Sequence, residues 1–300
     1  MASERYFAGV ELGGTKSIAV LARGREIVVQ ATFPTGLPAQ TLHALSDRLL
    51  AWQKVTPFAA LGIASFGPLR LSPEAADFGH MLATPKPGWE GALIGEALTA
   101  GLECPWRIDT DVNAAALAEY RWGAGAGCSS VCYITIGTGV GGGLVMNGQP
   151  VHGAMHPEIG HLKLRRAAGD SFPGTCRFHG DCIEGLVSGP ALAARMGGDA
   201  TAVPDDDPRW QAVVSDIAEL ACSILSTTSA QRILIGGGVG IARASLLPHV
   251  QKETVARLCG YLPFVDEETV RDIIRAPQLG SEAGPMGAVA LAHMAAGEAR

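Results

Sequence analysis

One short stretch of the sequence concentrates potential metal ligands, the run CRFHGDC from Cys176 to Cys182. Cys176, His179 and Cys182 are spaced three residues apart, so a loop could wrap two sulfurs and an imidazole around a tetrahedral ion. A fourth ligand is needed, and the upstream run HPEIGH offers His161 and His156 as candidates. A disulfide is the less favoured alternative, because seven cysteines spread thinly through 300 residues are typical of a reducing compartment.

Three glycine-rich turns follow apolar, strand-like runs; the first two are candidate phosphate cradles, and tight turns without a ligand are the alternative. The three turns are Gly13 to Lys16 in ELGGTK, Gly137 to Gly142 in GTGVGG, and Gly236 to Val239 in GGGV. Glycine lets backbone N–H groups approach phosphate oxygens without obstruction by a Cβ atom. The second turn satisfies the dinucleotide pattern G-x-G-x-x-G, with Glu158 near the place of the ribose acid. It runs into GLVMNGQPV, however, where Asn-Gly predicts a hairpin rather than the helix of a dinucleotide fold.

Asp111 lies where the strand-like run WRIDT meets a helix that is predicted to begin at about Asn113. The helix dipole is expected to keep this carboxylate ionised. Such a carboxylate suits a general base that deprotonates a hydroxyl group, and a plain helix N-cap is the alternative. Glu158 and Glu184 lie near the turns and the cysteine cluster and are natural acceptors for sugar hydroxyls, with ordinary surface residues as the alternative.

Strands that alternate with helices position these residues, and this alternation predicts an α/β fold. Tyr6–Val29 and Cys132–Val151 share one pattern of apolar strand, glycine turn, apolar strand and second turn. Aligned without gaps, Gly13 falls on Gly137 and Gly24 falls on Gly148. We interpret the pattern as an internal duplication, and a chance likeness of two glycine hairpins is the alternative.

Composition restricts the class of protein. A chain of 300 residues exceeds what one core usually supports, so two lobes are expected. Hydrophobic residues make up 47% and charged residues 17%, without an apolar run long enough to cross a bilayer. A net charge of -6 disfavours a nucleic-acid partner, which usually demands a basic face. The first residues lack the basic and apolar regions of a secretion signal, so a cytoplasmic location is expected.

Several motifs, in this order, resemble the ROK family of sugar kinases, and most closely its bacterial fructokinase branch. They are ELGGTK, ASFGPL, TPKPGW, DTDVNAAALAE, IGTGVGGG, HPEIGH, CRFHGDCIEG and IGGGV. The resemblance implies an α/β fold of the duplicated, actin-like (ribonuclease H-like) type, with ATP and sugar bound in a cleft between two lobes. The smaller lobe would comprise residues 1–112, with a C-terminal helix at about 285–297 packed back onto it. The larger lobe would comprise residues 113–284 and carry a zinc site and the adenosine pocket.

The resemblance also implies a role for each motif. Asp111 would be the general base in the ATP-dependent phosphorylation of a hexose. The phosphates and the adenosine of ATP would be bound by Gly13, Gly14, Thr15, Lys16, Thr138, Gly139, Gly141, Gly236, Gly237, Gly238 and Gly284. The sugar would be bound by Gly67, Pro68, Thr110, Asp111, Glu158, His161 and Glu184. His161, Cys176, His179 and Cys182 would hold a structural zinc ion, which with four protein ligands has no open position for catalysis.

Mg²⁺ would arrive with ATP, and Glu11 could hold it through water. Departures from the family pattern favour D-fructose as the substrate and fructose 6-phosphate as the product. Thr110 stands where glucokinase-like members have Asn, the cluster has C-x-x-H-x-x-C spacing, and TPKPGW is typical of fructokinases. Glucokinase and mannokinase are the alternatives within the family.

Two other functions are less favoured. A ROK-type sugar-binding regulator needs a helix-turn-helix segment ahead of the first glycine hairpin, which here begins at about residue 6. An NAD-dependent oxidoreductase conflicts with the hairpin that follows GTGVGG. The family resemblance further implies a homodimer, and neither a nucleic acid nor a membrane is expected as a partner.

Overall fold

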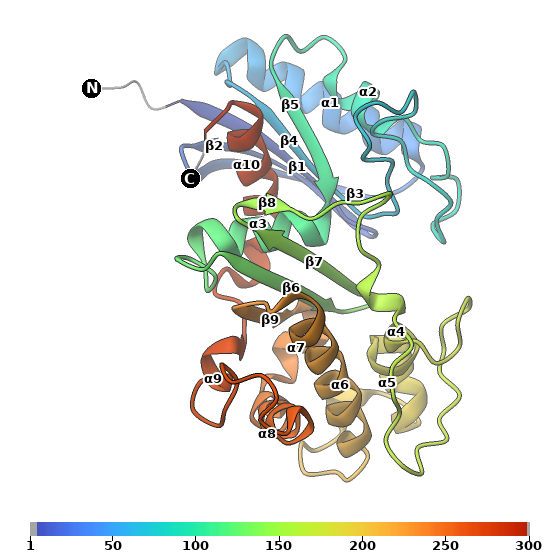
Figure 1. The fold of residues 1–300 in the computed structure, drawn as a ribbon. Coiled ribbons are helices and arrows are strands. Elements are labelled where there is room, and N and C mark those ends of the chain that lie inside the picture. Colours follow the sequence, from blue (N-terminus) through green and yellow to red (C-terminus); the bar gives the residue numbers. More distant parts are fainter. Residues whose placement is uncertain (1–4, 299–300) are drawn as a thin grey trace. The chain divides into compact units, whose positions relative to one another are not determined.

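The computed structural model describes residues 5–298, which form two five-stranded sheets and the helices that cover them (Figure 1). The strands are β1 (Tyr6–Leu12), β2 (Lys16–Arg23), β3 (Glu26–Pro34), β4 (Leu61–Ser65), β5 (Trp106–Thr110), β6 (Ser130–Ile136), β7 (Val140–Met146), β8 (Gln149–Pro150), β9 (Arg232–Gly236) and β10 (Ile274–Arg275). The α-helices are α1 (Pro38–Val55), α2 (Ile94–Thr99), α3 (Asp111–Trp122), α4 (Ile183–Val187), α5 (Gly189–Met196), α6 (Trp210–Thr228), α7 (Gly237–Ala242), α8 (Leu247–Leu258), α9 (Val270–Ile273) and α10 (Ala283–Ala295). Within residues 5–298 no helix is long and apolar enough to span a membrane.

The two sheets repeat one topology. The first has the order β3-β2-β1-β4-β5, and the second has the order β8-β7-β6-β9-β10. In each sheet a strand, a glycine turn and two further strands are followed by two strands that pair in parallel, β4 with β5 and β9 with β10. The duplication inferred from the aligned glycines therefore extends to the order of all five strands.

The chain divides into two compact units. The first contains the chain up to Trp122, residues Val145–Pro157 and the chain from Ser281 onward. The second contains Gly123–Leu144 and Glu158–Gly280. The boundary at residues 112 and 113, set from the sequence, falls in the first turn of α3, whereas the compact first unit keeps the whole of this helix and also α10.

Strands β1, β2 and β4 of the first sheet are buried on both faces because they alternate side chains between two cores, whereas β3 is largely exposed. Ala8 packs with Leu45 of α1 in one core, while its neighbour Phe7 packs with Val289 of α10 in the other. A Cβ atom at Gly62 of β4 would overlap a backbone oxygen of α10. Glycine at this position thus lets α10 lie directly on the sheet.

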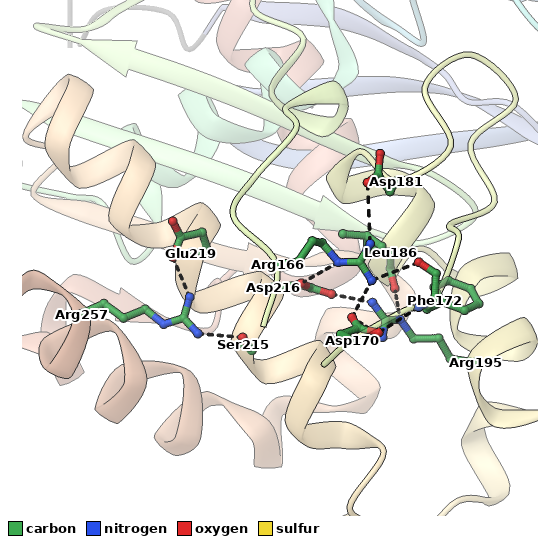
Figure 2. A network of polar contacts seen from close by, with 10 residues as sticks. All are labelled: Arg166, Asp170, Phe172, Asp181, Leu186, Arg195, Ser215, Asp216, Glu219 and Arg257. Atoms are coloured by element: carbon green, nitrogen blue, oxygen red, sulfur yellow. Dashed lines mark hydrogen bonds and ion pairs between the residues drawn. The ribbon is translucent and has the colours of Figure 1, made fainter. Parts of the chain in front are cut away.

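The second unit contains a network of buried charges that joins the loop before the cysteine cluster to two helices (Figure 2). Arg195 of α5 donates to Asp216 of α6 at 2.6 Å and to Asp170 of the loop at 3.1 Å. Arg166 also donates to Asp170, at 2.6 Å. The side chains of Arg195 and Asp216 are only 6% and 2% exposed, and burial raises the pKa of Asp216 to about 6 despite the arginines. The network therefore anchors the loop to the core of this unit.

Candidate functional site

The predicted base, Asp111, is the first residue of α3 and follows β5 directly. The hydroxyl of Thr110 accepts a hydrogen bond from the backbone N–H of Asn113 at 3.2 Å, so Thr110 caps the helix. Asp111 Oδ1 accepts from the adjacent N–H of Val112 at 2.8 Å. The alternative that Asp111 is a plain N-cap is therefore wrong, because the preceding threonine has this task.

Burial controls the electrostatics of Asp111. Desolvation, together with the nearby charge of Glu11, raises the pKa of Asp111 to about 7, although the N–H of Val112 lowers it. Burial also raises the pKa of Glu11, partly offset by Lys16. Desolvation thus opposes the ionisation that the helix dipole is expected to favour. A carboxyl group with a pKa near 7 can both accept and release a proton at neutral pH.

Sequence reasoning missed a buried polar network at the junction of β5 and α3. Asp109 is 0% exposed, and its Oδ1 accepts from the N–H of Thr110 and from Asn113 Nδ2, both at 2.8 Å. His152 Nε2 lies 3.1 Å from Oδ1 and 3.0 Å from Oδ2 of Asp109. The available signal was Asp109 within the strand-like run WRIDT, because a carboxylate that a strand buries needs partners.

The predicted wall of the sugar site, Gly67 and Pro68, is held from two directions within the first unit. Thr84 of the TPKPGW motif donates to the carbonyl of Gly67 at 3.3 Å. His156 Nε2 accepts from the N–H of Leu69 at 3.1 Å, and a Cβ atom at Gly67 would lie 3.5 Å from the His156 ring. His156 is thus occupied here and is not the fourth ligand of the cysteine cluster.

The first glycine turn is closed by the chain itself and by a lysine. The N–H of Gly13 donates to the carbonyl of Lys16 at 3.1 Å, and a Cβ atom on Gly13 would lie 2.7 Å from that oxygen. Lys86 Nζ donates to the carbonyl of Gly14 at 2.6 Å. Gly14, Thr15 and Lys16 are exposed. The position of Lys86 in TPKPGW was the only signal for this contact, which sequence reasoning missed.

The second glycine turn contacts Glu184, which the sequence assigned to the sugar. Glu184 Oε2 accepts from the N–H of Val140 at 3.2 Å, and a Cβ atom on Gly139 would lie 2.7 Å from the same oxygen. Thr138 at the tip of the turn is exposed. Glycine at residue 139 is therefore needed for the carboxylate to support the turn, and a sugar contact of Glu184 stays a prediction.

The third glycine turn joins β9 to α7 in the second unit. Gly237 has a φ of +79°, and a Cβ atom there would lie 2.6 Å from the backbone nitrogen of Ile136. Gly238 is exposed. Gly284, which the family resemblance assigns to ATP, lies in α10 of the first unit, where a Cβ atom would overlap the Glu11 carboxylate. Glycine at residue 284 thus leaves room for the Glu11 carboxylate.

The four predicted metal ligands come together in the second unit. The ligand atoms of His161, Cys176, His179 and Cys182 lie within 4.8 Å of one another. His161 Nδ1 is 3.8 Å from Cys176 Sγ and 3.6 Å from Cys182 Sγ, and His179 Nδ1 is 3.8 Å from Cys176 Sγ. Zinc bond lengths place sulfur and nitrogen ligands roughly 3.5 Å apart on the edge of a tetrahedron. The four residues therefore fit a zinc ion.

Local backbone structure explains this arrangement. The N–H of Cys176 donates to the carbonyl of Gly180 at 3.1 Å, and the N–H of Gly180 donates back at 2.8 Å. Gly180 has a φ of +66°, which turns the chain sharply between His179 and Cys182. The N–H of Ile183 donates to the carbonyl of Leu162 at 2.9 Å and so brings the His161 segment to the turn. Burial raises the pKa of the Cys182 thiol to about 11, so a bound cation is needed to hold its thiolate.

Comparisons with known proteins find sugar kinases that match nearly the whole chain. The model of the ROK family matches residues 7–295. The fructokinase of Zymomonas mobilis is 36% identical over 96% of this chain and 97% of its own length, and the fructokinase of Pediococcus pentosaceus is 34% identical over 95% and 97%. A ROK hexokinase from Thermus thermophilus superposes with a TM-score of 0.77 over 98% of this chain and 100% of that chain, at 23% identity. This likeness establishes the fold, which is of the actin-like, two-lobe type.

Proposed function

Because the chain belongs to the ROK family, we propose that it is a fructokinase, which transfers the γ-phosphoryl group of ATP to O6 of D-fructose. Relatives that are named fructokinases and that align over nearly the whole chain support this substrate. The main structural support for this reaction is the Asp111 carboxyl group at the start of α3. Its pKa is about 7, and the hydroxyl of Thr110, not this carboxyl group, accepts the capping bond from Asn113.

In the proposed reaction Asp111 accepts the proton of the O6 hydroxyl as O6 attacks the γ-phosphorus of ATP. The bond from the γ-phosphorus to the bridging oxygen breaks, and ADP leaves. Phosphoryl transfer needs in-line positioning and charge stabilisation more than covalent catalysis. Bound Mg²⁺ supplies charge neutralisation at the phosphates, and we propose the Glu11 carboxylate as its partner through water, since carboxylate oxygens suit this ion.

Backbone N–H groups of the exposed turns are the proposed phosphate contacts. In the first unit they belong to Gly13–Lys16, whose turn is supported by Lys86. In the second unit they belong to Thr138, Gly139 and Gly141, whose turn is supported by Glu184. Gly236–Gly238 are proposed to contact adenosine, and a contact of Gly284 with ATP stays a prediction.

The proposed sugar contacts of the first unit are Asp111, Thr110, Gly67 and Pro68. The hydroxyl oxygen of Thr110 already accepts the bond from Asn113, so this hydroxyl would donate to the sugar. The contacts of Glu158, His161 and Glu184 of the second unit with the sugar stay predictions from the family resemblance. His161 presents Nδ1 to the sulfurs, so Nε2–H would be the group for a sugar hydroxyl.

We propose that the Cys/His cluster holds a structural zinc ion. Its four protein ligands complete a tetrahedral site and leave no position for a reacting water. All seven cysteines are free, which supports the proposed cytoplasmic location. A homodimer stays a prediction from the family resemblance.

The experiment that tests this function is a coupled assay of ADP release with fructose, glucose and mannose as acceptors. We expect the highest kcat/KM with fructose. Asp111→Asn is expected to lower kcat by about 10² to 10⁴, the usual contribution of a general base. Turnover of glucose well above that of fructose would refute the substrate, and an unimpaired Asp111→Asn variant would refute the base.

A further inference from the structure

Residues 151–157 contain two histidines that bind two different places in the first unit. His152 contacts Asp109 at the end of β5, and His156 contacts Leu69 shortly after β4. β4 and β5 are neighbouring parallel strands, with Ser65 of β4 opposite Thr110 of β5. Both contacts therefore lie at the carboxyl ends of adjacent strands, where α/β sheets bind their ligands.

The contact of His152 fixes the junction of β5 and α3, where Asp111 lies. Asp109 is fully buried, and both of its oxygens lie within 3.1 Å of His152 Nε2. The same carboxylate accepts from the N–H of Thr110 and from Asn113 Nδ2. His152 Nε2–H thus donates to the carboxylate that holds the residues on both sides of Asp111. Asp109 Oδ2 is buried and has no hydrogen-bond partner within the described residues, so loss of the His152 ring would remove the N–H that lies 3.0 Å from it.

The contact of His156 fixes the Gly67–Pro68 segment. The ring is 6% exposed, and burial is the main cause that lowers the pKa of His156. A neutral ring keeps the lone pair on Nε2 that accepts from the N–H of Leu69 at 3.1 Å. The ring also packs against Gly67, where a Cβ atom would touch it at 3.5 Å.

We propose that His152 and His156 are positioning residues for the sugar, which together set the distance between Asp111 and the Gly67–Pro68 wall. The inference rests on the proposed function, because it assumes that these two groups contact one hexose. Neither histidine touches a reacting atom. Each acts through a partner, His152 through Asp109 and His156 through Leu69.

The kinetic test compares leucine and glutamine at each position. His152→Leu is expected to lower kcat about tenfold, because small displacements of a catalytic group are costly in rate. His156→Leu is expected to raise the KM for fructose about tenfold, because it leaves a buried N–H unpaired. Neither variant should change the KM for ATP. His152→Gln and His156→Gln keep a donor and an acceptor, respectively, and should restore most of the loss.

His43→Leu is the matched control, because this histidine of α1 is 78% exposed and contacts only Asp47, at 3.4 Å, among the ion pairs of residues 5–298. Its kcat and both KM values should equal those of the wild type. Leucine variants of His152 and His156 that lose thermal stability but keep the wild-type kcat and fructose KM would overturn the inference. Equal increases in the KM for fructose and for ATP would also overturn it.

Hydrogen exchange tests, without a measurement of turnover, whether each histidine holds its own segment of backbone. His156→Leu should speed backbone exchange at residues 66–70 and leave residues 110–113 unchanged, and His152→Leu should do the reverse. Exchange that rises equally in both segments would overturn the claim that His152 and His156 hold different segments. A wild-type protein that phosphorylates no hexose would refute the proposed function, and the exchange pattern would still decide whether each histidine holds its own segment.

Discussion

Asp111 is a carboxyl group whose surroundings make it a stronger base than a free aspartate. Burial raises its pKa to about 7, and the negative charge of Glu11 adds to the shift. Thr110 takes over the capping of α3, which leaves one carboxylate oxygen of Asp111 without a capping task. At the scale of one residue, a pKa of about 7 supports the proposal that Asp111 accepts a proton at neutral pH.

The first prediction concerns the pH dependence of this residue. A base acts only when it is deprotonated, so kcat/KM for fructose should fall as the pH decreases through about 7. Glu11→Gln removes a nearby negative charge and should move this acidic limb to lower pH. The measurement is kcat/KM between pH 5 and pH 9 for both proteins. A wild-type rate that stays constant between pH 5 and pH 8 would contradict the assignment of Asp111.

The sequence predicted the place of Asp111 at the start of a helix but not its pKa. The junction of WRIDT with a helix is visible from residue types alone. Its pKa depends on burial and on Glu11, which lies 100 positions earlier in the chain. The partners of Asp109 were missed for the same reason, since His152 reaches it from 43 residues away.

At the scale of elements, the turn from Cys176 to Cys182 is shaped by its own backbone. The paired hydrogen bonds of Cys176 and Gly180 close the turn, and the Ile183–Leu162 bond brings in the histidine. Spacing predicted the two cysteines and His179 correctly as a cluster. It could not choose between His161 and His156, because that choice depends on where each histidine lies in the fold.

The second prediction is that this turn needs zinc. The purified protein should contain about one zinc per chain. Cys176→Ser or a strong chelator should lower the melting temperature and raise the KM for fructose, because the ligand segment carries His161. Cys259→Ser is the control, since this cysteine is exposed and outside the cluster. A protein that is free of zinc and fully active would contradict the proposal.

At the scale of the whole molecule, a duplicated sheet accounts for most of the architecture. The two glycine hairpins predicted the repeat, and the shared strand order extends it to both sheets. The division into units was harder to predict, because Val145–Pro157 and the chain from Ser281 return to the first unit after long excursions. Such returns depend on tertiary packing, as where α10 lies on Gly62, and not on local sequence patterns.

The third prediction concerns the stability of the second unit. Arg195→Met should lower the free energy of unfolding by about 3 to 5 kcal/mol, because it removes the 2.6 Å partner of the buried Asp216, although Asp170 keeps Arg166. Urea unfolding monitored by circular dichroism measures this loss. Arg271→Met is the control, since Arg271 is exposed. A loss below about 1 kcal/mol would mean that the network in Figure 2 contributes little to stability.

The position of the transferred phosphate tests the central claim most directly. ³¹P nuclear magnetic resonance of a reaction with ATP, Mg²⁺ and D-fructose should show fructose 6-phosphate and ADP in equal amounts. The same reaction with Asp111→Asn should show almost none over the same time. Phosphate on a different hydroxyl, or equal product with the variant, would contradict a fructokinase that uses Asp111 as its base.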